Sequence, residues 1–164
     1  QKQNKQAFEQ LYTSWGYEKL SSYPEYQSTI QDIQQNYPIR TNPDTPQEWI
    51  LNKVWYQTVL FRNQPQSLTD VSYVLIPLSS YEYPYDKVHI MNQTDVKWFT
   101  EHFGHTNHCY HPDETSAVLL SKLIMNDYIN IIANDAYQHY PVSYSPAEET
   151  LLQWVHKVAL TTEQ

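Results

Sequence analysis

Glycine is nearly absent from the sequence. The 164 residues include only Gly16 and Gly104, and glycine is the residue that most readily adopts the positive φ angles of tight β-hairpin turns. We therefore expect a mainly α-helical fold. The ten prolines fall largely between segments with helical spacing, so they mark the boundaries of the expected helices.

Cysteine, basic residues and long apolar runs are also scarce. The single Cys109 excludes an intramolecular disulfide framework. No run of about eighteen apolar residues occurs, so the sequence predicts no membrane span. Lys and Arg number 10 against 18 Asp and Glu, which gives a net charge of −8. Phosphate backbones and anionic lipids repel such a chain, so we expect no nucleic-acid partner.

Aromatic residues, in contrast, are abundant. They form 15% of the chain within a hydrophobic share of 40%, which is enough to fill a sizeable core and to exclude a disordered acidic tail. The length is typical of one domain, so we expect a single helical domain over residues 1–164. The first residue is Gln1 rather than Met, and we expect an exported protein whose signal peptide has been removed.

Hydrophobic spacing predicts the positions of the helices. Apolar residues three and four apart indicate helices over 4–20 and, with a thinner apolar stripe, over 24–37. Thr-Pro-Gln-Glu at 45–48 and Ser-Pro-Ala-Glu at 145–148 have the residue types of a helix N-terminus. The first of these motifs predicts a helix that continues to Phe61, and the second predicts the C-terminal helix.

The longest expected helix covers 113–139. Apolar residues occupy most of its circumference, and a narrow polar stripe repeats every four residues from Lys122 to Asn134. A helix that is apolar nearly all round is typical of one packed on several sides. We therefore expect a compact bundle of about five to six helices around this central helix. The pattern also allows a small β-hairpin near 71–91, because 71–78 is rich in β-branched and aromatic residues.

A group of histidines is the first candidate site. Neutral imidazole and thiolate are good zinc ligands, and a tetrahedral site needs several of them to converge. The spacing matches neither the paired-cysteine zinc modules nor the helical His-Glu-x-x-His motif, so a solvated loop whose rings cap helix ends is the alternative interpretation. The candidate metal ligands are His102, His105, His108, Cys109 and His111.

A tyrosine-rich segment is the second candidate site. Residues 81–86 alternate tyrosine with acid and lie outside any periodic segment. Tyrosine is enriched at protein interfaces because it combines a large apolar area with a polar group. The candidate partner-binding residues are Tyr81, Glu82, Tyr83, Tyr85 and Asp86.

Three functions are consistent with these patterns. The first is a non-enzymatic acidic binding protein of the inhibitor or immunity type, which needs no cofactor and whose charge attracts a basic protein partner. The second is a zinc protein, a metal-dependent hydrolase in which Glu101, Asp113 or Glu114 acts as general base on a bound water. The third is a phage, secretion or surface assembly component whose tyrosine segment makes subunit contacts.

Overall fold

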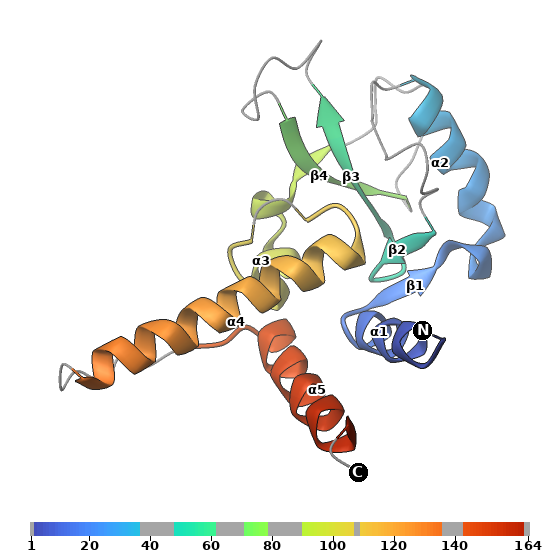
Figure 1. Cartoon of the computed structure of the whole chain (residues 1–164). Helices are drawn as coiled ribbons and strands as arrows, with labels where there is room; N and C mark the ends of the chain where they lie inside the picture. The colour runs from blue at the N-terminus through green and yellow to red at the C-terminus, as the bar shows by residue number, and fades with distance from the viewer. Residues whose placement is uncertain are drawn as a thin grey trace.

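The computed structural model describes residues 2–36, 48–61, 71–78, 90–106, 109–135 and 143–162. Within these ranges the chain forms an antiparallel sheet with helices on both of its faces (Figure 1). Two short 3-10 helices, Leu20–Ser22 and Gln93–Asp95, accompany the main elements. In chain order the main elements are α1 (Lys2–Ser14), β1 (Tyr17–Lys19), α2 (Pro24–Asn36), β2 (Trp49–Leu51), β3 (Trp55–Phe61), β4 (Val71–Pro77), β5 (Met91–Asn92), α3 (Lys97–Phe103), α4 (Pro112–Asp135) and α5 (Pro146–Thr162).

The five strands lie across the sheet in chain order, and each is antiparallel to the next. The longest ladder joins β3 to β4 and runs from Trp55 opposite Pro77 to Phe61 opposite Val71. The strand expected over 71–78 is therefore present as β4, and β5 pairs with it. Because the sheet has five strands, the fold is mixed α/β, and the expected mainly α-helical bundle is wrong.

The helix expected over 45–61 is wrong for a local reason. Asn52 and Lys53 both have positive φ angles, 49° and 64°, and the N–H of Val54 donates to the carbonyl of Leu51 at 3.3 Å. These residues make a hairpin turn between β2 and β3 without glycine, which asparagine tolerates better than most other residues. The expectation that a chain with few glycines forms few hairpins is therefore wrong at this position.

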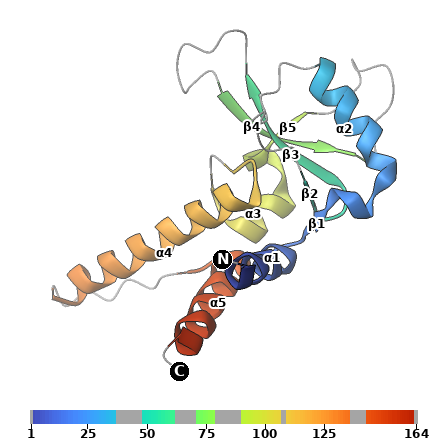
Figure 2. The same cartoon turned by 45° about the vertical axis from the view of Figure 1, so that its right-hand side comes forward.

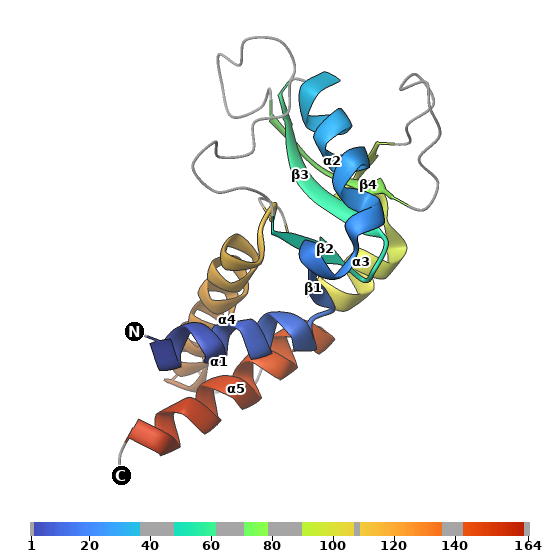
Figure 3. The same cartoon turned by 90° about the vertical axis from the view of Figure 1, so that its right-hand side faces the viewer.

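Strand residues alternate between two hydrophobic cores. Trp49, Leu51 and Leu75 belong to the larger core, which also contains side chains of α1, α3, α4 and α5. Ile50 and Ile76 belong to the smaller core, which contains the apolar side of α2. This alternation is the two-residue period of a strand covered on both faces. Figure 3 shows α2 lying apart from the group formed by α1, α4 and α5.

Over residues 112–127, where its side chains are described, helix α4 packs on one side. Leu119 and Leu123 are buried, whereas Leu120, Ile124 and Met125 are 43%, 60% and 55% exposed. Figures 1 and 2 show its C-terminal half extending away from the sheet. The expectation that this helix is the centre of a bundle, packed on several sides, is therefore wrong. No helix within the described ranges combines the length and the apolarity that a membrane crossing requires.

A buried polar network holds the beginning of α4 against the sheet. The hydroxyl of Tyr17 donates to Oε1 of Gln57 at 2.7 Å and lies 2.8 Å from Oγ1 of Thr115 in the first turns of α4. Nε2 of Gln57 donates to the carbonyl of Cys109 at 3.1 Å, and Nε2 of Gln93 donates to the same carbonyl. These hydrogen bonds fix the chain just before α4, which is where the candidate site lies.

Helix α5 begins as the sequence predicts. The N–H of Ser145 donates to Oε2 of Glu148 at 2.7 Å, and the N–H of Glu148 donates to Oγ of Ser145 at 3.3 Å, so the capping box is confirmed. One turn of this helix also anchors α1, because Nε1 of the buried Trp15 donates to the carbonyl of Ala147 at 3.1 Å. This contact places the end of α1 beside the start of α5.

Candidate functional site

The structure separates the described histidines of the candidate zinc site. His102 lies in the last turn of α3, His105 is exposed on the following loop, and His111 immediately precedes α4. Among the residues that the structure describes, no group of three or more His, Cys, Asp or Glu is arranged to hold a metal ion. His108 lies outside the described residues, so the zinc site as a whole stays a prediction.

His102 is part of the hydrophobic packing around α3. Its ring stacks on Trp98 with the ring centroids 5.1 Å apart, and it meets Phe103 edge-on at 4.7 Å. Burial lowers the pKa of His102, although a hydrogen bond from its ring to the backbone of Trp15 acts in the opposite direction. The buried Nε2 atom has no hydrogen-bond partner. The ring is therefore neutral at pH 7 and faces protein rather than an open site.

Cys109, the fifth candidate ligand, is fully buried in the larger core. Burial raises the pKa of its thiol, while hydrogen bonds with Thr106 and Thr115 lower it to a smaller extent. A thiol in this environment is protonated at neutral pH, whereas metal binding and nucleophilic attack need the thiolate. The clearest role of this residue is structural, through its carbonyl group, which accepts the two glutamine hydrogen bonds described above.

The tyrosine segment lies outside the described residues, but another tyrosine cluster is visible beside α4. Tyr110 stacks on Tyr73 of β4 with the ring centroids 6.3 Å apart, and its hydroxyl donates to Oε1 of Glu114 at 3.2 Å. Burial, followed by the charge of Glu114, raises the pKa of both phenols. Partner binding by the tyrosine segment therefore stays a prediction, and the residues concerned are Tyr81, Glu82, Tyr83, Tyr85 and Asp86.

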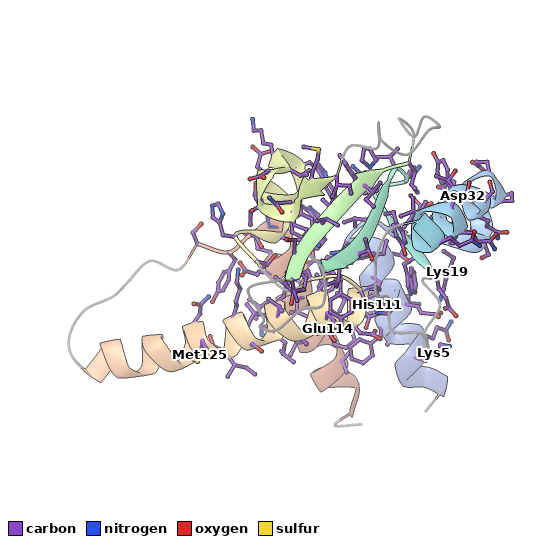
Figure 4. The ribbon with its side chains drawn as sticks, turned by 90° about the horizontal axis from the view of Figure 1, so that it is seen from above. Lys5, Lys19, Asp32, His111, Glu114 and Met125 are labelled. Carbon is purple, nitrogen blue, oxygen red and sulfur yellow. The ribbon has the colours of Figure 1, made fainter. Side chains whose placement is uncertain are left out.

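A cleft of about 560 Å³ lies between α1, the strands β1 and β2, and the first turns of α4. Its aromatic lining comes from Phe8 and Tyr12 of α1 and from Trp49 of β2. Trp49 meets Tyr12 edge-on, with the ring centroids 5.7 Å apart. Figure 4 labels three further lining residues, Lys5, Lys19 and His111. The cleft is thus an aromatic groove that ends in titratable groups.

One ammonium group of the chain already occupies this cleft. Nζ of Lys19 lies 3.8 Å from the centroid of the Trp49 ring. The same atom is 3.2 Å from Oε1 of Glu9 and 3.3 Å from Oε2 of Glu48. An aromatic face between two carboxylates is a favourable environment for a cation. The arrangement therefore shows which kind of charge the cleft accommodates.

At the other end of the cleft, Asp113 links α1 to α4. The hydroxyl of Tyr12 donates to Oδ1 of Asp113 at 2.6 Å, and burial together with this hydrogen bond raises the pKa of Tyr12 above its ordinary value. Oδ2 of Asp113 lies 3.4 Å from Nδ1 of His111, and the same nitrogen accepts a hydrogen bond from the N–H of Asp113 at 3.2 Å. His111 therefore caps the first turn of α4 through its ring.

Among the candidate ligands that the structure describes, His111 is the one that lines the cleft. Burial lowers the pKa of His111, and the nearby carboxylates of Asp113, Glu114 and Glu48 oppose this effect. Because burial is the larger of these effects, the imidazole is neutral at pH 7. The charged lining groups are then three carboxylates, Glu9, Glu48 and Asp113, and two lysines, Lys5 and Lys19.

The residues of the cleft are far apart in the sequence. They come from positions 5–19, 48–49 and 111–116, and no motif joins these three segments. Asp113 and His111 are the lining residues that the sequence singles out as candidates, and the simplest interpretation of Asp113 is a first-turn carboxylate that complements the helix dipole. That interpretation still holds here, but the same carboxylate also accepts the Tyr12 hydrogen bond across the cleft.

Comparisons with known proteins add no further assignment. No protein-family model matches the chain, and no match is found among the curated proteins or the solved structures. The class that the structure itself defines is a mixed α/β domain with a five-stranded antiparallel sheet. The chemistry of the cleft is therefore the basis for assigning a function.

Proposed function

We propose that the protein is a non-enzymatic binding protein that recognises a basic protein partner, with a lysine or arginine side chain of the partner entering the cleft beside α4. The observation that carries this proposal is the position of Lys19. Its ammonium group lies over Trp49 and between Glu9 and Glu48. A cation from a partner meets the same aromatic face and the same carboxylates, and it competes with Lys19 for them.

The charges of the chain support a basic partner. The net charge is −8, and a surface of one sign increases the rate at which an oppositely charged partner arrives. Around the cleft, Asp113 and Glu114 occupy the first turn of α4, and Tyr12 and Tyr110 each donate a hydrogen bond to one of them. Tyrosine with acid is a combination that can stack on a guanidinium group and neutralise it.

The cleft also has the size and composition of a place where one side chain anchors a partner. Its volume of about 560 Å³ is within the usual range for small-ligand pockets. Binding energy in protein interfaces is concentrated at a few aromatic and arginine residues that fill such pockets. We therefore expect one basic side chain to dominate the interaction.

The test is the affinity of a lysine-rich peptide for the protein and for two cleft variants, measured by fluorescence anisotropy. Lys19→Ala removes the internal competitor, so the peptide should bind more tightly. Glu48→Gln removes one carboxylate, so the peptide should bind about two- to fivefold more weakly, which corresponds to roughly 0.5–1 kcal/mol for an exposed charge pair.

Two matched controls separate the cleft from the net charge. Lys97 and Glu101 form an exposed ion pair on α3, with Nζ and Oε1 3.5 Å apart. Lys97→Ala and Glu101→Gln therefore change the net charge by the same amounts as the two cleft variants. If each control changes the affinity as much as its cleft counterpart, the peptide is attracted only by overall charge, and the proposed recognition in the cleft is wrong.

A further inference from the structure

The outer face of α4 is exposed and aliphatic. It consists of Ala117, Leu120, Ser121, Ile124 and Met125, and its three large side chains are between 43% and 60% exposed. Figure 4 shows Met125 on the part of α4 that lies beyond the sheet. Burial of large aliphatic side chains against a partner is favourable. A contiguous exposed apolar surface of this kind indicates an interaction site.

The outer face has a ridge beside a hollow. Leu120 and Ile124 are one turn apart and form the ridge. The adjoining hollow has a volume of about 420 Å³, and its lining includes the small residues Ala117 and Ser121, with Lys122 and Asn126 at its far side. Helices associate when the ridge of one fits the groove of the other. A surface with both features side by side is complementary to a copy of itself turned by a two-fold rotation about an axis parallel to the helix.

The five residues of the outer face also carry no charge. Lys122 is the only charged residue between positions 115 and 126. Its ammonium group donates to the carbonyl of His105 at 3.2 Å and lies 3.8 Å from Oε1 of Glu148. A basic partner therefore gains no charge complementarity on this face. Two copies with a charge of −8 each repel one another over acidic surfaces, and they avoid that repulsion where the contact is neutral.

We propose that a second copy of this chain docks on the outer face, so that two α4 helices pack side by side in parallel about a two-fold axis that runs along the helices. In this arrangement the ridge of each copy fills the hollow of the other. The helix is 24 residues long, about 36 Å at 1.5 Å per residue, and it extends beyond the sheet (Figures 1 and 2). The partner copy can therefore reach the outer face without contacting the cleft.

Sedimentation velocity over a concentration series tests the proposal. The monomer mass is 19.5 kDa, so the weight-average mass should rise toward twice that value between about 1 μM and about 1 mM, the range expected for a small aliphatic interface. Ile124→Glu places a charge on the ridge of both copies and should weaken the dimer at least about tenfold. Gln153→Glu adds the same charge at an exposed position of α5 and should leave it unchanged.

Cross-linking locates the contact. The exposed Ser121→Cys variant should form a disulfide-linked dimer under mild oxidation, because the two α4 helices face one another, whereas the equally exposed Gln153→Cys should not. The native Cys109 is buried and does not interfere. A wild-type protein that stays monomeric throughout the series overturns the proposal. So does a dimer that Ile124→Glu leaves intact, or equal cross-linking of the two cysteine variants.

Discussion

Two surfaces that both involve α4 differ in their chemistry. The cleft at the helix start combines three aromatic rings with three carboxylates, two lysines and an imidazole. The outer face, one to three turns further along, is aliphatic, and its neighbour Lys122 is held by Glu148 and a carbonyl group. One helix thus presents a charged groove and a neutral ridge. The two surfaces therefore suit different partners and respond to different solution conditions.

The difference originates in how α4 is held. Its first turns are tied to the sheet by the buried hydrogen bonds of Tyr17 and Gln57, so the polar groups of the cleft keep a fixed geometry. Further along, only the side of the helix that carries Leu119 and Leu123 is covered. Burial on that side stabilises the fold, and exposure on the opposite side leaves aliphatic surface for association.

The largest expected effect separates the two sides of α4 in the monomer. Leu119 is fully buried and Leu120 is 43% exposed, so the same leucine-to-alanine change acts on opposite sides. Leu119→Ala should lower the free energy of unfolding by about 2–5 kcal/mol, and Leu120→Ala by less than about 1 kcal/mol, because only the first leaves a cavity. Urea denaturation at low protein concentration gives both values.

The same pair also tests what Leu120 does in association. In sedimentation velocity, Leu120→Ala should weaken the dimer while the monomer keeps its stability. Equal losses of folding stability for the two variants would contradict the one-sided packing of α4, and an unchanged dimer would remove Leu120 from the proposed ridge.

A smaller effect distinguishes the surfaces by pH. Burial lowers the pKa of His111 below its ordinary value, which is about 6.5, so this imidazole is neutral at pH 7 and gains a proton only as the pH falls below that value. Protonation adds a positive charge to the cleft, so the lysine-rich peptide should bind more weakly on acidification. The outer face and the adjoining hollow contain no histidine or carboxylate among their residues, so association through this face should not follow the change.

His111→Asn provides the control, because asparagine keeps a capping acceptor before α4 and does not titrate. Fluorescence anisotropy of the peptide from pH 7.5 downwards, to about pH 5.5, should show a shallower decline for this variant than for the wild-type protein. Identical pH profiles for the two proteins would exclude His111 from the binding response.

The sequence predicted those parts of the fold that depend on local signals. The capping box at Ser145 and Glu148, the helix that follows it and the strand over 71–77 are all present. The hairpin at Asn52 and Lys53 was missed because the turn has no glycine, and a proline-glutamate motif before Trp49 was interpreted as a helix start. Tertiary pairing with β1 and β3 overrides that local signal.

The candidate sites were harder to predict, for a physical reason. The density of histidines between 102 and 111 is visible in the sequence, but His102 stacks on Trp98 in α3 whereas His111 caps the start of α4, so these two rings lie in different places. The cleft has the opposite character, because Lys19, Trp49 and Asp113 meet only after the sheet has formed. A site assembled from three separate segments has no signature in a single sequence.

The most direct test of the account measures both associations in the same protein while the salt concentration is raised from about 0.05 M to about 0.5 M. Screening weakens interactions between exposed charges but has little effect on aliphatic contacts. The account predicts that peptide binding in the cleft weakens severalfold, while the dimer formed through the outer face is unchanged or slightly stronger. Peptide binding that is insensitive to salt, or a dimer that dissociates as salt rises, would contradict the distinction between the two surfaces.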